Sequence, residues 1–438
     1  MRSLILISLI SILSSCTKPE GSDPICNPAD YEIFLTSPST NTVERLKKEC
    51  EFWSEKISGE PRGFLYHQKL GAAQASLFEK TGNIDFLNES AESFKVASQL
   101  VFGKHKADNL LTQSSLAIKK HNFDQANHFA LKARGLATEK FAAYMMQFDS
   151  EMELGNYELA KSILDRNTNF QSFDFLVRLS KFKDHEGNLD SAIFYMEKAY
   201  QMVLREESSR AIWATANLGD MYGHAGRVSD SYQKYLEALD QNATYDYALK
   251  GIAWIAYSAD RNPKEAGRIL DVLARRTGLP DNLLLLTEMA DANGDKELGK
   301  EYIQSFLEEA RKEKYGAMYN KYLVNLYSEE INNYDQAIEL ALQEVGRRST
   351  PATNDWLAWA YYLSGQSQKA LKVYLEKVEG KTYEPEVLYH MGVVYKNAGM
   401  EKQGLKLLNE ALEASYELGP QISRKIEVEL SSQLAYKY

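Results

Sequence analysis

The side chains of this 438-residue chain with the greatest capacity for chemistry are seven histidines and three cysteines, and their spacing forms no catalytic motif. Zinc proteases place two histidines four residues apart on one helix, and no such pair occurs in the sequence. A Gly-x-Ser-x-Gly nucleophile elbow and a Gly-rich phosphate loop ending in Lys-Ser/Thr are also missing from it. Adjacent carboxylates such as Glu308-Glu309 and Glu329-Glu330 are expected on solvated helix faces, because 61 residues are acidic. We therefore predict a protein that is not an enzyme and that holds no metal or cofactor.

The charge of the chain restricts its partners. Its formal net charge is −10 and its pI is near 5.4. A negative body disfavours non-specific binding to nucleic acid and to anionic membrane surfaces. The paired arginines Arg275-Arg276 and Arg347-Arg348 stand where helices are expected to end, as the helix dipole favours. We therefore predict no nucleic-acid partner.

Helices must position whatever this chain binds, because its apolar residues recur at i, i+3, i+4 and i+7 over segments of about a dozen residues. A longer period of about 34 residues is superimposed on this pattern. Its units carry a large apolar residue, then Gly or Ala, then Tyr three residues later: Leu218-Gly219 with Tyr222, Leu357-Ala358 with Tyr361, and Met391-Gly392 with Tyr395. A small residue lets two antiparallel helices approach closely, and a glycine four residues after the tyrosine can end the first helix in the left-handed conformation.

This pattern resembles the tetratricopeptide repeat family, whose units are helix–turn–helix hairpins. The turn glycines that carry the resemblance are Gly82, Gly155, Gly187, Gly226, Gly294, Gly365 and Gly399. The resemblance covers roughly residues 62–418, in about ten units, although Trp254 stands where a small residue is expected. It implies an all-α solenoid, whose core grows by stacking and leaves an open concave groove.

The resemblance also implies where a partner would bind, because in that family certain positions of each first helix face the concave groove. Carried onto this sequence, those positions include aromatic side chains interleaved with polar ones, which suits recognition of an extended peptide or a helix. The predicted partner-binding groove consists of Trp213, Asp220, His224, Tyr319, Tyr322, Trp359, Tyr362, Tyr389, Lys396 and Asn397. The alternative is that Trp359 and several of the tyrosines pack between repeats.

The first residues predict export and lipid attachment. Arg2 precedes an apolar run from Leu4 to Leu13 that is too short to span a bilayer. The following Leu13-Ser14-Ser15-Cys16 resembles a bacterial lipobox, which implies a signal peptide over residues 1–15 and acylation of Cys16. Multiple acyl chains anchor a protein stably. Thr17 lacks the acidic character of the inner-membrane retention signal, so we expect a lipoprotein of the bacterial cell envelope at the outer membrane, on its periplasmic or its surface face.

The segment after the lipobox predicts a tether. Residues 17–30 contain three prolines, a glycine and several polar residues, as flexible linkers do. Cys26 and Cys50 remain as a pair in an oxidising compartment, so we expect a disulfide between them, with two unpaired thiols as the alternative.

These patterns divide the chain into a signal peptide (1–15), a tether with an N-terminal helical segment (16–60), a superhelix of repeats (61–419) and a C-terminal capping helix (420–438). The capping helix is predicted from its apolar stripe Ile422, Ile426, Leu430 and Leu434. We predict a membrane-tethered scaffold that binds a protein or peptide partner in its groove. The alternative is a glycan- or nutrient-binding lipoprotein of the SusD-like kind, which also places such helices behind a lipidated cysteine.

Overall fold

The computed structural model describes residues 23–36 and 40–431 of the chain. The predicted signal peptide 1–15, the predicted lipidation site Cys16 and the last residues of the predicted capping helix, 432–438, lie outside the described residues.

The described residues form helices and no strands. The first half comprises α1 Pro28–Thr36, α2 Thr40–Gly59, α3 Phe64–Thr81, α4 Ile84–Gln99, α5 Gly103–Lys119, α6 Phe123–Leu136, α7 Phe141–Leu154, α8 Tyr157–Arg166, α9 Phe173–His185, α10 Leu189–Val203, α11 Ser209–His224 and α12 Val228–Gln241. The second half comprises α13 Asp246–Ser258, α14 Pro263–Arg276, α15 Asp281–Ala292, α16 Lys296–Ala310, η1 Glu313–Tyr315, α17 Asn320–Glu329, α18 Tyr334–Arg347, α19 Pro351–Leu363, α20 Ser367–Val373, the π-helix η2 Tyr374–Val378, α21 Pro385–Asn397, α22 Glu401–Glu413 and α23 Ser415–Ser431.

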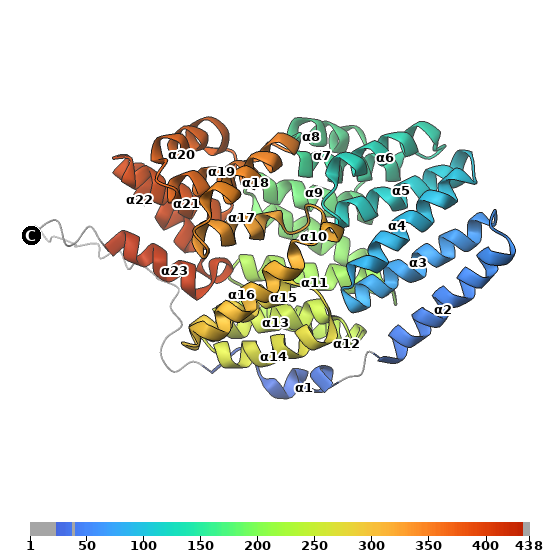
Figure 1. Cartoon of the computed structure of the whole chain (residues 1–438), viewed down its shortest axis with the longest axis horizontal. Coiled ribbons are helices and arrows are strands. Elements are labelled where there is room, and N and C mark those ends of the chain that lie inside the picture. The colour runs from blue at the N-terminus through green and yellow to red at the C-terminus, as the bar shows by residue number, and fades with distance from the viewer. Residues whose placement is uncertain (1–22, 37–39, 432–438) are drawn as a thin grey trace, which may run out of the picture.

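Helices α3 to α22 pair in chain order as antiparallel hairpins, and each hairpin stacks on the next (Figure 1). Helix α20 continues into η2, so these two segments form one second helix. The pairs run from α3/α4 to α21/α22, which gives ten units in the described residues. The predicted all-α solenoid of helix–turn–helix repeats is therefore confirmed, with the predicted number of units.

Small residues at the helix contacts explain why the hairpins pack so closely. A Cβ atom on Gly219 of α11 would lie 3.0 Å from the ring of Tyr235 on α12. The approach is closer still in the last hairpin, where a Cβ atom on Gly404 of α22 would lie 2.7 Å from the carbonyl oxygen of Gly392 on α21. Gly404 therefore has no room for a Cβ atom, whereas at Gly219 the ring of Tyr235 would have to shift by a few tenths of an ångström.

The repeat at α13/α14 differs from its neighbours in its turn. The amide of Asn262 donates to the carbonyl of Ala256, six residues earlier in the chain. In the preceding unit the equivalent amide, that of Arg227, donates to the carbonyl of Tyr222, which is only five residues earlier. One extra residue is accommodated, and Arg261 takes the left-handed conformation with a φ of 57°. Ala253 is therefore the small packed residue of this unit, and Trp254 is turned toward the concave face.

The superhelix is wound so tightly that its early and late repeats touch. The hairpin turn at Gly82 approaches Leu279, the turn at Gly155 approaches Thr350, and the turn at Gly187 packs against the ring of Tyr383. Each of these contacts joins residues that are about 195 positions apart in the sequence. Successive coils of the solenoid therefore lie edge to edge, and the expectation of a fully open groove is wrong.

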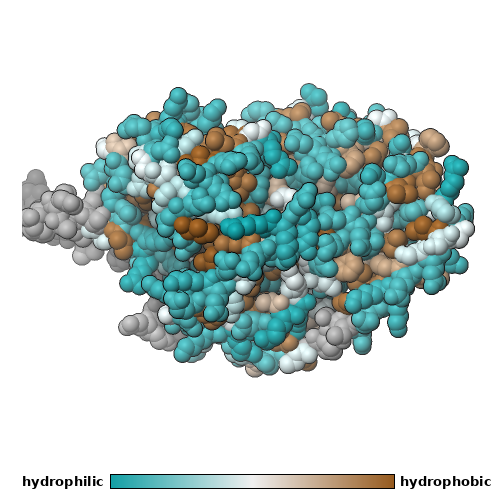
Figure 2. Space-filling model, viewed as in Figure 1, coloured by the Kyte–Doolittle hydropathy of each residue, from teal (hydrophilic) through white to brown (hydrophobic). Residues whose placement is uncertain are grey.

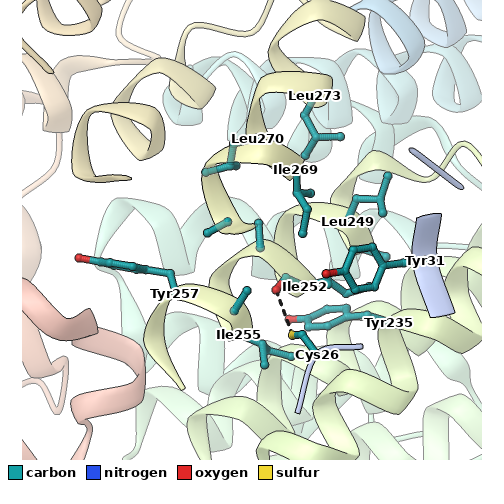
Figure 3. Close-up of a cluster of buried hydrophobic side chains, with 14 of the residues drawn as sticks. Cys26, Tyr31, Tyr235, Leu249, Ile252, Ile255, Tyr257, Ile269, Leu270 and Leu273 are labelled. Atoms are coloured by element: carbon teal, nitrogen blue, oxygen red, sulfur yellow. Dashed lines mark hydrogen bonds between the residues drawn. The ribbon is translucent and has the colours of Figure 1, made fainter. Parts of the chain in front are cut away.

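The segment before the repeats is docked, which corrects the predicted tether for residues 23–30. The amides of Ile25 and Cys26 donate to the carboxylate of Asp260, both at 2.8 Å. Tyr31, on the following helix α1, is buried in the hydrophobic cluster that residues of α12, α13 and α14 form (Figure 3). Its hydroxyl donates to Glu265 at 2.6 Å. These contacts hold the N-terminal segment against the sixth hairpin.

The predicted Cys26–Cys50 disulfide is also wrong, because Cys50 is an unbridged thiol on α2. The thiol of Cys26 instead lies in the buried cluster, where Sγ donates to the carbonyl of Ile252 at 3.6 Å (Figure 3). The two residues belong to separate packing units, since α1 docks on α12 whereas α2 packs on α3.

Candidate functional site

The concave face of the solenoid is formed by the first helix of each hairpin, and α23 crosses part of it. Helix α23 leaves α22 and contacts α21, α13 and α11, which are all first helices (Figure 1). Its kink at Gly419 has a φ of 74°, and a Cβ atom there would lie 2.9 Å from the indole ring of Trp254. The C-terminal helix therefore occupies the groove that the sequence predicts for a partner.

Polar contacts fix α23 to the groove. The carbonyl of Tyr416 accepts hydrogen bonds from Trp254 Nε1 at 3.1 Å and from Ser258 Oγ at 2.6 Å. Gln421 donates to the carbonyl of Glu288 at 3.2 Å, and Lys425 lies 3.5 Å from Glu329. These contacts join the last repeat to the middle of the solenoid.

Glu288 on α15 gives this contact a pH dependence. Burial raises the pKa of Glu288 to about 7, from an ordinary value of 4.5. Because the folded-state pKa lies above the unfolded value, this group contributes stability that is complete below about pH 4.5 and is lost as pH rises through about 7.

We expect Glu288→Gln to raise the free energy of unfolding at about pH 8 and to leave it little changed at about pH 4.5. The increase in the free energy of unfolding at about pH 8 is at most about 3 kcal/mol, and partial solvation of the site makes the increase smaller. Urea unfolding at the two pH values measures the difference, with Glu301→Gln on the exposed face of α16 as the matched control. Equal effects at both pH values would contradict the assignment.

Three of the predicted groove residues lie in the core. Tyr319 is 3% exposed, Trp359 is 6% exposed and Tyr389 is 8% exposed. The indole of Trp359 stacks on His390 with ring centroids 4.1 Å apart, and its Nε1 donates to Glu329 at 2.9 Å. The structure corrects the prediction for these three aromatic residues, because their rings pack between repeats and leave little surface for a partner.

A second group of predicted groove residues is engaged by polar neighbours. Lys396 donates to the carbonyl and the carboxylate of Glu429 on α23. Asn397 donates to the hydroxyl of Tyr362 at 2.9 Å. The remaining two of this group lie on α11: Asp220 accepts from Tyr235 and Tyr247, and His224 lies 3.8 Å from Glu417.

Trp213 and Tyr322 remain accessible, and only Trp213 lines a large cavity. Trp213 is 37% exposed and Tyr322 is 39% exposed. The cavity at Trp213 has a volume of about 770 Å³ and lies at the N-terminal ends of α11, α13 and α15. A volume of this size is typical of ligand sites, which range over about 300–1,000 Å³.

The repeat period builds this cavity. Trp213, Tyr247 and Asp281 line it and follow one another at intervals of 34 residues, so they occupy the same position in three successive first helices. The opposite wall comes from Glu79 and Lys80 at the end of α3, in the preceding coil of the superhelix. We call this cavity the coil pocket.

Ion pairs compensate most of the charge in the coil pocket. Arg276 pairs with Asp246 at 2.8 Å, and Lys250 pairs with Asp281 at 2.6 Å. Burial raises the pKa of Asp246, although Arg276 lowers it in opposition. Burial also raises the pKa of Tyr245 to about 12. Both acidic side chains that line the pocket on α13 and α15 are therefore matched by a cation.

Sequence reasoning identified one residue of the coil pocket, Trp213, and missed the others. Tyr247 could have been found by adding the repeat period to Trp213, but Trp254, which stands where a small residue is expected, hid this equivalence. Lys80 could not have been found in that way, because it reaches the pocket only through the contact between two coils.

The described residues hold neither a metal-binding cluster nor a helix that could span a membrane. No group of three His, Cys, Asp or Glu side chains that could hold a metal ion occurs among them. Within the same residues, every helix is too short or too polar to cross a bilayer.

Comparison with known proteins shows sequence similarity over a limited part of the chain. No family model matches the sequence. The photosystem I assembly protein Ycf3 of Prochlorococcus marinus is 28% identical over 85 residues, which are 19% of this chain and 47% of that protein. The match thus spans about half the length of this curated relative.

Solved structures with similar helices include several repeat proteins. YrrB, described as a TPR protein with an unusual peptide-binding site, has 16% identity and a TM-score of 0.27, over 46% of this chain and 97% of its own. PilF of Pseudomonas aeruginosa has 18% identity and a TM-score of 0.35, over 48% of this chain and 94% of its own. A tetratricopeptide repeat protein of Parabacteroides merdae has 15% identity and a TM-score of 0.34, over 59% of this chain and 98% of its own.

The assignment of this chain rests on its own geometry. Its hairpins stack in chain order, and small residues occupy the contacts between helices. Residues in the left-handed backbone conformation form the turns at regular intervals. The chain is therefore an all-α solenoid of helix–turn–helix repeats, with the period that its resemblance to tetratricopeptide repeats implies.

Proposed function

We propose that this protein is a membrane-tethered interaction scaffold that holds a short segment of a partner protein in the coil pocket. The observation that carries the proposal is a concave cavity of about 770 Å³ in which Trp213 and Tyr247 are exposed. Aromatic side chains in concave, partly desolvated sites are the usual binding hot spots of protein interfaces.

The coil pocket supports this function better than the groove near the last repeats. There, Trp359 and Tyr389 are buried and α23 covers the neighbouring surface. In the coil pocket, Trp213 is 37% exposed and Tyr247 is 48% exposed, so a partner can reach both rings without displacing any part of the described chain. Rigid helices also hold the two rings in place, which lowers the entropic cost of binding.

The proposed tether is an acylated Cys16, by the lipobox resemblance. The chain is docked from Ile25 onward, nine residues after Cys16. Nine residues span at most about 30 Å when fully extended. An anchored Cys16 would therefore hold the α1 side of the solenoid near the membrane, and confinement at that surface would raise the effective concentration of membrane partners.

We expect Trp213→Ala/Tyr247→Ala to lower partner recovery at least tenfold, because the loss of two hot-spot aromatics costs about 2 kcal/mol or more in binding. The measurement is affinity capture of the tagged full chain from detergent-solubilised membranes of its own cells, with quantitative mass spectrometry. The matched control is Phe52→Ala/Phe102→Ala, which removes two exposed aromatic residues far from the pocket.

The tether is tested in the same experiment with a Cys16→Ser variant, which should move the protein out of the membrane fraction. A partner list that is unchanged by the pocket substitutions would overturn the assignment of the pocket. A Cys16→Ser protein that stays in the membrane fraction would overturn the lipid anchor.

A further inference from the structure

We propose that the coil pocket selects a compact anionic ligand, an apolar or aromatic group that carries one carboxylate. This inference deepens the proposed function and rests on it for the location of the site. Three properties of the pocket support it: its closed end, its two cations without an ion pair and its apolar walls.

The pocket is closed at one end by the contact between two coils of the superhelix. Lys80 Nζ donates to Thr244 Oγ1 at 3.1 Å, and the amide of Gly278 donates to the carbonyl of Thr81 at 2.8 Å. Immediately beside these bonds, Gly82 packs against Leu279. A long peptide cannot continue through this contact, so the pocket takes a ligand of one or two side chains in size.

The charges left over in the pocket are positive. Asp246 and Asp281 are paired with Arg276 and Lys250, as described above, and Glu79 is paired with Lys119 at 2.6 Å. The two remaining cations are Lys80 and Arg210, and neither forms an ion pair within residues 23–36 and 40–431, although the charge of Lys80 also acts on Asp246 and lowers the pKa of that carboxyl.

The position of Arg210 favours an anion from outside the chain. Arg210 lies on the first turn of α11 with its guanidinium 5.3 Å from the ring centroid of Phe173, which leaves its N–H groups available for a carboxylate. The N-terminal ends of α11, α13 and α15 point at the same cavity and contribute positive dipole ends.

The walls of the pocket are suited to an apolar body. Trp213 and Tyr247 contribute aromatic surface, and Ile212, Leu273 and Leu279 add aliphatic surface. An apolar group gains affinity by leaving water here. A carboxylate held by two cations at the rim of such a pocket adds charge-assisted hydrogen bonds.

Two sources can supply this chemistry. A partner protein would supply it as an aspartate or glutamate next to an apolar residue, and solution would supply it as a free small organic acid. The experiment separates the two.

The test is calorimetric titration of the purified full chain with three probes that share one apolar body: 4-phenylbutyrate, 4-phenyl-1-butanol and 4-phenylbutylamine. We expect the carboxylate to bind at least tenfold more tightly than the alcohol, and the amine to bind most weakly. Lys80→Gln/Arg210→Gln should reduce the affinity for the carboxylate to that for the alcohol. The control Lys300→Gln, on an exposed face of α16, should change nothing.

A peptide arm identifies the source. Tighter binding of acetyl-Glu-Phe-amide than of 4-phenylbutyrate supports the partner segment, and the reverse order supports a free acid. Equal affinity for the three small probes, preference for the amine, or no binding of any probe would overturn the inference. These outcomes are independent of partner capture: a capture that depends on Trp213 and Tyr247, without preference for an anion, leaves the proposed function standing and removes only this inference.

Discussion

Replacement of Gly404 by alanine is expected to destabilise the protein by about 2–4 kcal/mol, through overpacking of the last hairpin. The added Cβ would lie 2.7 Å from the carbonyl oxygen of Gly392 and 2.7 Å from the backbone nitrogen of Lys396. Both contacts are to backbone atoms, so no rotation of a side chain can relieve them, and α21 and α22 must separate. Alanine would otherwise favour the helix by about 1 kcal/mol, which the clash exceeds.

The matched control is Gly267→Ala, in the interior of α14. The nearest atom to an added Cβ at Gly267 is Cβ of Met289 at 3.7 Å, which is ordinary contact. This variant should be unchanged or slightly more stable. Urea unfolding followed by circular dichroism measures both variants. Equal midpoints for Gly404→Ala and the wild type would show that the hairpin adjusts freely and would contradict the packing argument.

Asp355→Leu is expected to cost about 3–5 kcal/mol, because it removes one partner of a buried ion pair. Asp355 lies 3.1 Å from Nδ1 of His390, and it also accepts the hydroxyl of Tyr374 at 2.8 Å. All three residues are buried. Burial by itself lowers the pKa of His390, but the Asp355 carboxylate, with smaller contributions from Glu386 and Glu329, more than offsets burial and raises the pKa above 6.5.

The sign of the pH dependence follows from that shift. Because the folded-state pKa of His390 is above the unfolded value, the stability from this pair is complete below about pH 6.5 and is lost as pH rises through the folded-state pKa. The coupling between the two residues should therefore be larger at about pH 6 than at about pH 9.

A double-mutant cycle with Asp355→Leu, His390→Leu and the double variant measures this coupling by urea unfolding. The double variant should be less destabilised than the sum of the single variants, since an apolar pair leaves no buried charge uncompensated. Additive losses would contradict the ion pair as the source of the effect.

On the face of the protein seen in Figure 2, apolar residues do not gather into one large patch. Figure 2 shows hydrophilic residues over most of one face, with apolar residues scattered among them. A continuous apolar patch would mark an extended interface, whereas scattered apolar residues are ordinary for a protein surface. This distribution agrees with recognition concentrated in a pocket.

The sequence alone determined the local architecture. Gly219, Gly392 and the tyrosines that follow them specify close helix contacts at a fixed period, and the turn glycines end the first helices. These features act within one hairpin or between neighbouring hairpins, so their spacing is visible along the chain. The number of repeats and the all-α class follow directly from them. The position of Trp213 on the concave face followed from the same period.

Only the tertiary structure decided which part of the concave face stays accessible. The contact of Gly82 with Leu279, the pairing of Cys26 with Ile252 and the crossing of α23 over Trp254 join residues that are about 160–230 positions apart. Such contacts depend on the small rotation between successive hairpins, which accumulates over several units and leaves no local pattern in the sequence. Lys80 came to line a pocket built by helices far along the chain for this reason, whereas Trp359 and Tyr389 became core residues through contacts between adjacent repeats.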